Sequence, residues 1–196
     1  MTGPDGGPGG GGDDTSRLVR RVLWSLPTGL YVVGSRSGDR CNLMTCSWVM
    51  QVATAPRLVA VGIEADAVTR MLVEEGGRFT VSLLARADRA VVRRFVKPVR
   101  DVERDDTGAL TAMQGEPVVE VAGGLPVLAR AAAWVACDVR TVADGAVLAG
   151  GAGPASHVLA VGEVVAVGAS ATFDSLGDGS DAGILSMDDT RMSYGG

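Results

Sequence analysis

The sequence predicts a mainly β protein, an antiparallel β-barrel with a few helices packed on it. Short β-branched stretches separated by turn residues dominate the chain from residue 28 onward, and only two or three segments have helical periodicity. The strands are joined by hairpin-type connections without regular β-α alternation. A doubly wound parallel sheet is disfavoured, because the glycine-rich run at 149–153 leads into a strand and not into a helix.

The N-terminal part is predicted to be a flexible tail followed by one helix. Residues 1–14 are mostly Gly, Pro and Asp, which bury too little apolar surface to offset the entropy of ordering, so a single domain is expected over 15–196. Ser16 is expected to cap a helix from Arg17 to Ser25, and Pro27 ends it. Its apolar side chains are spaced to face one side: Leu18, Val22 and Leu26.

The next segments are predicted to be strands around one helix. A turn at 37–39 separates the first two strands, and Gly76 and Gly77 stop the helix. The predicted strands are Gly29 to Ser35, Asn42 to Thr54, Arg57 to Glu64 and Arg78 to Leu84, and the helix is Ala67 to Glu75.

The second half of the chain is predicted to contain one more helix, an irregular stretch and further strands. Val91, Val92 and Phe95 would be the buried face of a helix from Asp88 to Val96, which Pro98 ends. Residues 99–116 are polar without periodicity and predict an irregular surface segment. Later strands are expected from Leu128 to Val142, Ser156 to Ala169 and Ile184 to Met187, with a loop from Ser170 to Gly183 and a tail from Asp188 to Gly196.

Composition excludes several classes of function. The chain has 196 residues, 46% of them hydrophobic, and a net charge of −5, so no domain-wide basic surface for nucleic acid is expected. The N-terminus lacks the pattern of a signal peptide and no apolar run approaches the roughly 20 residues of a membrane span, which predicts a cytoplasmic protein without a membrane partner. Three cysteines and the single His157 have no metal-ligand spacing, so neither a disulfide framework nor a metal site is expected.

A series of segments resembles the flavin reductase-like, FMN-binding split-barrel family, and covers nearly everything after the tail. The segments, in order, are LPTGLYVVGSR, NLMTCSWVMQVATAPRLVAVGIE, AVTRMLVEEGGRFTVSLL, RRFVKPV, SHVLAVGEVV and ILSMDDTRMSYGG. The resemblance implies a split β-barrel of Greek-key type that binds FMN, with FAD as the alternative flavin.

The resemblance also implies a set of site residues. Those for the flavin are Met44, Thr45, Cys46, Ser47, Trp48, Ser82, Leu83, Arg94, Phe95 and Lys97. Among them Thr45, Ser47 and Ser82 would donate through hydroxyl groups, although relatives often have Asn where Ser82 stands. Arg94 and Lys97 would hold the phosphate, unless they belong to a solvated face. A plain strand hairpin is the structural alternative for residues 42–48.

Two further residues are assigned by position. His157 matches the family's histidine near the nicotinamide and would be the catalytic residue, although Ala155 and Ser156 replace the usual Gly-Asp before it. A structural role in an apolar strand is the alternative. Tyr194, near the C-terminus, would bind substrate at the mouth of the site or else be a surface anchor.

The implied function is that of a homodimeric flavin reductase. Hydride would pass from NADH or NADPH to the flavin, and reduced flavin would supply a separate monooxygenase or another acceptor. Two alternatives remain open. One is a non-enzymatic FMN-binding electron carrier or sensor, to which the changed residues before His157 and Arg70 in place of a common histidine point. The other is a flavin-dependent oxidase or reductase of a specific small molecule.

Overall fold

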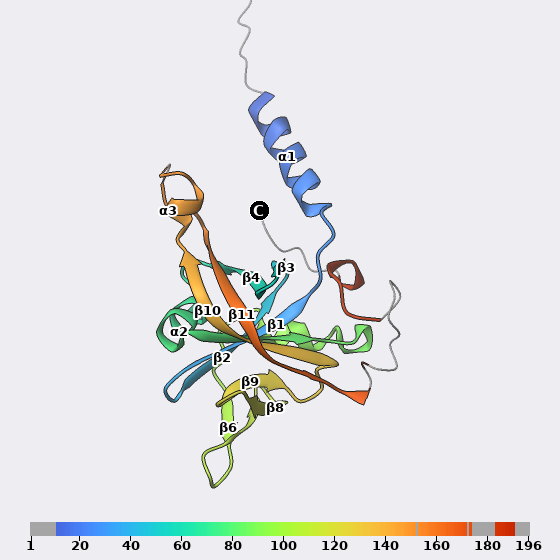
Figure 1. The fold of residues 1–196 in the computed structure, drawn as a ribbon. Helices are drawn as coiled ribbons and strands as arrows, with labels where there is room; N and C mark the ends of the chain where they lie inside the picture. Colours follow the sequence, from blue (N-terminus) through green and yellow to red (C-terminus); the bar gives the residue numbers. More distant parts are fainter. Residues whose placement is uncertain (1–10, 152, 172, 174–182, 191–196) are drawn as a thin grey trace, which may run out of the picture.

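The computed structural model describes residues 11–151, 153–171, 173 and 183–190, and its strands form two antiparallel sheets. The mainly β architecture with few helices is confirmed (Figure 1).

Seven strands form the larger sheet, in the order β2-β1-β5-β10-β11-β4-β3. They are β1 (Tyr31–Ser37), β2 (Arg40–Cys46), β3 (Val49–Thr54), β4 (Arg57–Glu64), β5 (Arg78–Leu83), β10 (Ala133–Ala143) and β11 (His157–Ala169). The predicted strand from Asn42 to Thr54 is in fact two strands, because the chain turns at Ser47 and Trp48. The strand predicted from Leu128 to Val142 begins only at Ala133.

The larger sheet curls on itself. Its two edge strands, β2 and β3, are consecutive in the chain, so the turn at Ser47 and Trp48 brings the two edges together. At this corner the thiol of Cys46 donates to the carbonyl oxygen of Gly62 on β4, 3.4 Å away, and the N–H of Gly62 donates to the carbonyl of Trp48 at 2.8 Å. The sheet therefore forms a barrel that closes at this corner.

A second sheet of four strands begins within the segment that was expected to be irregular and continues through 116–128, where no strand was predicted before Leu128. The strands are β6 (Val102–Arg104), β7 (Leu110–Met113), β8 (Glu116–Val121) and β9 (Leu125–Leu128). The prediction for 99–116 was wrong because β6 has only three residues, all of them exposed, and shows no apolar alternation. Its pairing depends on backbone hydrogen bonds and on turn residues, which composition does not reveal.

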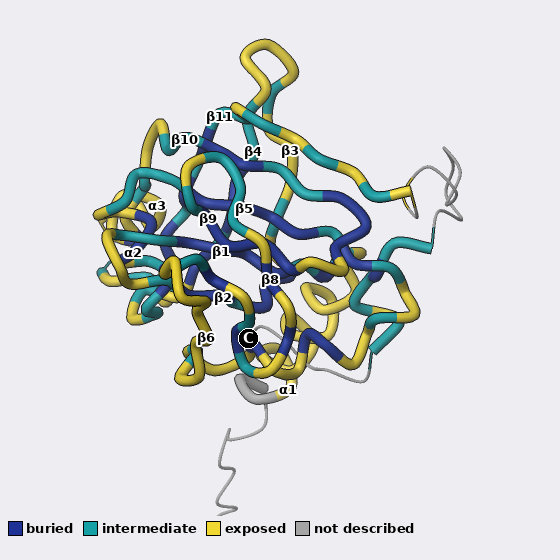
Figure 2. Tube along the Cα trace, turned by 90° about the horizontal axis from the view of Figure 1, so that it is seen from below, coloured by how far each residue is buried: buried dark blue, intermediate teal, exposed yellow. Residues whose placement is uncertain are grey.

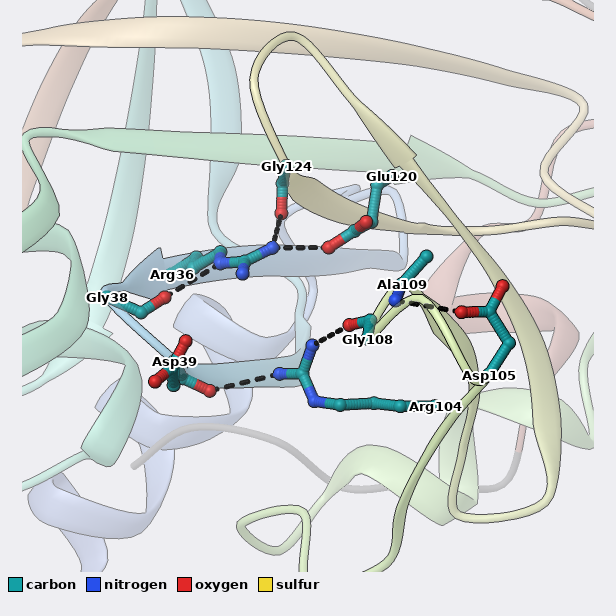
Figure 3. A network of polar contacts seen from close by, with 9 residues as sticks. All are labelled: Arg36, Gly38, Asp39, Arg104, Asp105, Gly108, Ala109, Glu120 and Gly124. Atoms are coloured by element: carbon teal, nitrogen blue, oxygen red, sulfur yellow. Dashed lines mark hydrogen bonds and ion pairs between the residues drawn. The ribbon is translucent and has the colours of Figure 1, made fainter.

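Two arginines fasten the second sheet to the β1–β2 hairpin, as Figure 3 shows. Arg36 on β1 pairs with Glu120 and donates to the carbonyls of Gly124, at 2.9 Å, and Gly38, at 2.8 Å. Arg104 on β6 donates to the carbonyl of Asp39 at 3.1 Å. Both contacts use the fork of a guanidinium group to join segments that are distant in sequence.

The two faces of the larger sheet have different coverings. Val32 on β1 belongs to a core between the sheet and the second sheet, whereas its neighbour Val33 belongs to the barrel interior. Successive residues of β1 therefore point to opposite faces, and the second sheet covers the outer face at β1, β2 and β5. Buried positions accordingly concentrate on these strands (Figure 2).

The helices depart from prediction at the ends of the chain more than in its middle. α2 (Val68–Gly76) ends as predicted, with Gly77 at φ 66° as its C-cap. α1 spans Gly11–Trp24, so it begins before the predicted Arg17 and Ser16 lies inside it instead of capping it. Most of the predicted tail lies outside the described residues. No helix in the described ranges is long and apolar enough to cross a membrane.

The helix predicted from Asp88 to Val96 consists of two 3₁₀ segments, η1 (Arg86–Asp88) and η2 (Val91–Phe95). The tighter turn places Val92 and Phe95 on one face, and both are fully buried. The strand expected from Ile184 to Met187 is reduced to isolated bridges, Ile184 with Ala85 and Ser186 with Gly29, followed by η3 (Met187–Asp189). A short helix, α3 (Gly145–Leu148), precedes β11.

Candidate functional site

A pocket lies along the free edge of β2, where the start of α2 and the segment after η2 meet. Its volume is about 220 Å³, and it is lined by Asn42, Met44, Glu64, Asp66, Ala67, Val68, Phe95, Val96, Lys97 and Pro98. Because β2 pairs only with β1, alternate backbone N–H and C=O groups of β2 point away from the sheet toward this edge. The pocket therefore combines an apolar lining with unpaired backbone donors and acceptors.

The charges of this pocket are unbalanced. Glu64 and Asp66 contribute two carboxylates and Lys97 one ammonium group, and no ion pair is found for any of the three within the described ranges. Ala67 at the N-terminus of α2 provides no side-chain cap, and the first turn holds no acidic residue. The backbone N–H groups of that turn add some positive character.

The candidate catalytic residue His157 lies next to this pocket. It is the first residue of β11 and lies opposite Glu64 of β4 in the register of the sheet. Its ring contacts Trp48, with ring centroids 4.3 Å apart, and the Nδ1 atom lies 2.9 Å from the hydroxyl of Ser156. Burial lowers the pKa of His157 below its usual 6.5, against the opposing effect of the Glu64 and Asp66 carboxylates. The imidazole is therefore neutral at pH 7.

The cysteine of the β2 motif faces the barrel interior. Cys46 is buried, and burial raises the pKa of its thiol to about 12. It is a packed core thiol that faces away from the pocket, next to Tyr31, whose own pKa is raised mainly by burial. Its neighbour Met44 packs against the same core and also lines the pocket.

The hydroxyl groups assigned to flavin contacts are buried elsewhere. Thr45 donates to the carbonyl of Val92 at 2.5 Å and holds η2 against β2. Ser82 is fully buried on β5 and its hydroxyl has no hydrogen-bond partner among the described residues, while its neighbour Leu83 is half-buried. Ser47 is buried at the corner between β2 and β3. None of these side chains lines the pocket.

The three residues assigned around the phosphate have different environments. Phe95 and Lys97 line the pocket. Arg94 instead pairs with buried Glu116, with Nε and Oε1 3.0 Å apart, and donates to the carbonyl of Gln114. It therefore fastens η2 to the second sheet. Tyr194 lies outside the described residues.

Three polar residues of the pocket, Asn42, Glu64 and Asp66, were not singled out from the sequence. Asn42 is buried; its amide donates to Thr69 at 2.8 Å and its carbonyl oxygen accepts from the N–H of Val99 at 2.9 Å. It ties β2 to α2 and to the segment after Lys97. Asn42 could have been noticed, because a polar residue in a predicted buried strand needs hydrogen-bond partners. Glu64 and Asp66 have no comparable signal in the sequence.

The chain is similar in sequence to known flavoproteins. Residues 23–179 match the flavin reductase like domain. The flavin reductase (NADH) of Kitasatospora aureofaciens is 33% identical over 143 residues, which cover 68% of this chain and 70% of that protein. The chain also matches diflavin flavoprotein A 3 of Nostoc at 28% identity, but spans only 21% of its length.

Solved structures show the same fold. The flavin reductase component of a bacterial two-component tryptophan halogenase is similar, with a TM-score of 0.61 and 27% identity over 79% of this chain and 88% of that one. The styrene monooxygenase flavin reductase of Pseudomonas putida S12 has a TM-score of 0.58 and 26% identity, over 76% of this chain and 86% of that one. A family match over most of the chain and a relative at this level of identity establish membership: the chain belongs to the flavin reductase family.

Proposed function

We propose that the chain is an NAD(P)H-dependent flavin reductase whose flavin, FMN or FAD, lies in the pocket at the edge of β2. The observation that carries the proposal is the combination of that free edge with the neighbouring Trp48–His157 pair, within a chain of this family. Such a pocket offers an apolar surface for a planar ring and a row of backbone groups for its oxygen and nitrogen atoms.

The residues present fit the ring of a flavin better than its phosphate. Met44, Phe95, Val96 and Pro98 provide apolar contacts, and the β2 backbone provides donors and acceptors. A phosphate would meet Lys97 and the N-terminus of α2, but also the carboxylates of Glu64 and Asp66. At about 220 Å³ the pocket is also smaller than the range usual for ligand sites, roughly 300 to 1,000 Å³, so a second surface is needed to complete it.

When bound, flavin supplies the hydride-accepting chemistry, and the protein supplies position and environment. Trp48 holds one face of His157, and Ser156 holds its Nδ1 atom. If the serine hydroxyl donates to Nδ1, the proton of the neutral ring resides on Nε2, which can then donate a hydrogen bond to the nicotinamide or to the reacting flavin. His157 would thus orient substrate in its neutral form.

The similarity to reductase components suggests a recipient for the product. One similar structure is named as the flavin reductase component of a two-component halogenase, and another as the flavin reductase of a styrene monooxygenase. We propose by analogy that reduced flavin leaves this protein for a monooxygenase-type partner. We further propose a homodimer, because the pocket needs a second wall and because apolar side chains remain exposed on the barrel.

The test is an anaerobic visible spectrum of the full chain with FMN or FAD, followed by NADH and then NADPH. The reductase proposal expects the flavin band to bleach with one nicotinamide, and turnover to fall at least tenfold in His157→Ala but not in Val147→Ala, an exposed residue on α3. Flavin that binds but stays oxidised would favour the carrier or sensor. A full rate in His157→Ala would refute the role given to His157.

A further inference from the structure

The helix α1 exposes an apolar face that none of the described residues covers. All side chains from Asp14 to Leu26 are exposed, and four of the apolar ones, Leu18, Val19, Val22 and Leu23, repeat at the i, i+4 spacing of one helix face. Their exposed fractions lie between 50% and 60%. Figure 1 shows α1 pointing away from the barrel.

This helix is too short to be more than marginally stable without packing contacts. It has 14 residues, and isolated helices shorter than about 12 to 15 residues are marginal in water even with the best helix formers. It makes no substantial packing contact with another described element. An amphipathic helix of this kind needs a surface to bury its apolar stripe.

The barrel has a matching uncovered face. The second sheet covers the outer face at β1, β2 and β5 but not at β3, β4 and β11. On that outer face Met50 pairs with Ala60, and Trp48 lies over Gly62, where an added Cβ would come within 3.0 Å of the indole. Trp48 is 43% and Met50 64% exposed, so the face presents two large apolar side chains to solvent. We name Trp48, Met50 and their strand neighbours the β3–β4–β11 face.

The charges beside the two apolar surfaces are opposite. Arg20 and Arg21 flank the apolar stripe of α1. Glu64 and Asp66 border the β3–β4–β11 face, because Glu64 lies opposite His157 in the register of β4 and β11 and the ring of His157 contacts Trp48. No ion pair is found for these four residues within the part of the chain that the structure describes. The rims of the two surfaces therefore carry complementary charges.

We propose that α1 of one copy of the chain docks on the β3–β4–β11 face of a second copy, with its apolar stripe on Trp48 and Met50 and its arginines beside Glu64 and Asp66. The inference rests on the homodimer of the proposed function and deepens it. In a two-fold dimer each copy gives one helix and receives one, so the contact forms twice. The docked arginines offset the pocket carboxylates that disfavour a flavin phosphate, and the helix supplies the second wall.

Sedimentation velocity on the full chain tests the docking surfaces. Val22→Asp and Met50→Asp each place a carboxylate in the proposed contact and are expected to convert a dimer into a monomer. The matched control, Val147→Asp, changes a valine on α3 that is more exposed than Val22 and should leave the dimer intact. A dimer that survives both Val22→Asp and Met50→Asp, or a wild-type monomer, would overturn the proposal.

Mixing the two variants separates exchange between copies from pairing of α1 with α1. A Val22→Asp chain keeps its β3–β4–β11 face and a Met50→Asp chain keeps its helix, so the mixture retains one of the two contacts and should form a weaker heterodimer. Helix-to-helix pairing would instead leave Met50→Asp dimeric on its own, which would contradict the proposal.

Cross-linking distinguishes docking on a second copy from docking on the same chain. Val22→Cys and Met50→Cys are combined in a Cys41→Ser background, since Cys46 and Cys137 are buried, and treated with a short bis-maleimide. The proposal expects a covalent dimer; a cross-linked monomer would refute it. Neither readout uses flavin, so a failure of the reductase function in the spectral test would be recognised separately.

Discussion

At the scale of single residues, the environment of His157 makes a testable statement about protonation. Burial against Trp48 holds its pKa below the usual 6.5, while Glu64 and Asp66 act in the opposite direction. Trp48→Ala should therefore raise this pKa, and Glu64→Gln should lower it further. Because His157 is the only histidine, its ring proton signals can be followed in an NMR titration without assignment. Met50→Ala is the control and should leave the titration nearly unchanged.

The same depressed pKa predicts how stability depends on pH. The unfolded chain binds a proton at His157 below about pH 6.5, whereas the folded chain resists it to lower pH. The contribution of His157 is thus fully present above pH 6.5 and is lost as the pH falls through 6.5 toward the folded pKa. His157→Gln should flatten this part of the stability curve, measured by urea unfolding between pH 5 and about 7.5. An unchanged slope would contradict the burial argument.

The pocket charges predict a preference among flavins. Lys97→Ala should weaken the binding of FMN by about threefold, which corresponds to the roughly 0.7 kcal/mol of an exposed ion pair, and should leave the binding of riboflavin unaffected. Glu64→Gln should tighten FMN by a similar factor, because it removes a carboxylate that repels the phosphate. Fluorescence titration with both flavins gives the comparison. Equal effects on FMN and riboflavin would show that neither residue senses the phosphate.

At the scale of secondary-structure elements, the side chain of Asn42 connects the segments that form the pocket. Its amide connects β2 to Thr69 on α2 and to the N–H of Val99. Asn42→Ala leaves these groups without partners in a buried place and should cost about 2 kcal/mol in the free energy of unfolding. Urea unfolding measures the loss, and Gln51→Ala on exposed β3 should change stability by less than about 0.5 kcal/mol.

The elements that could be predicted from the sequence are those with a strong apolar signal. β4, β5, β11 and α2 match their predicted ranges closely, because alternation and Gly76-Gly77 mark them. The whole second sheet was missed: all three residues of β6 are exposed, and β7, β8 and β9 are only four to six residues long, too short to show a clear period. The divided β2–β3 segment was missed because the turn at Ser47 and Trp48 lacks Gly, Pro, Asn or Asp.

The candidate site could likewise be predicted only in part from the sequence. Met44, Phe95 and Lys97 were assigned from the family resemblance and do line the pocket. Strand alternation places Thr45 and Cys46 on opposite faces, but the sequence did not indicate that both faces would be buried. Glu64 and Asp66 reach the pocket only because β4 ends beside β2, which is a consequence of barrel closure.

At the scale of the whole molecule, one buried carboxylate fastens two segments outside the strands to the second sheet. Glu116 on β8 is 6% exposed and pairs with Arg94 of η2 and with Arg130, which follows β9. Glu116→Ala should destabilise the protein by about 2 kcal/mol, less than a fully buried pair because both arginines are partly exposed. Glu163→Ala, which removes an exposed partner of Arg140, should cost well under 1 kcal/mol in the same thermal unfolding experiment.

The closure of the larger sheet also bears on aggregation. A strand edge that is left open is a template for the strands of other molecules, and here β2 and β3 meet at one corner of the barrel. In the smaller sheet the outer strand β6 carries Glu103 and Arg104, charges that repel added strands. Opening the corner at Ser47 and Trp48 would expose more of both edges, so we expect the first step toward fibrils on heating to be separation of β2 from β4 and not the loss of a helix.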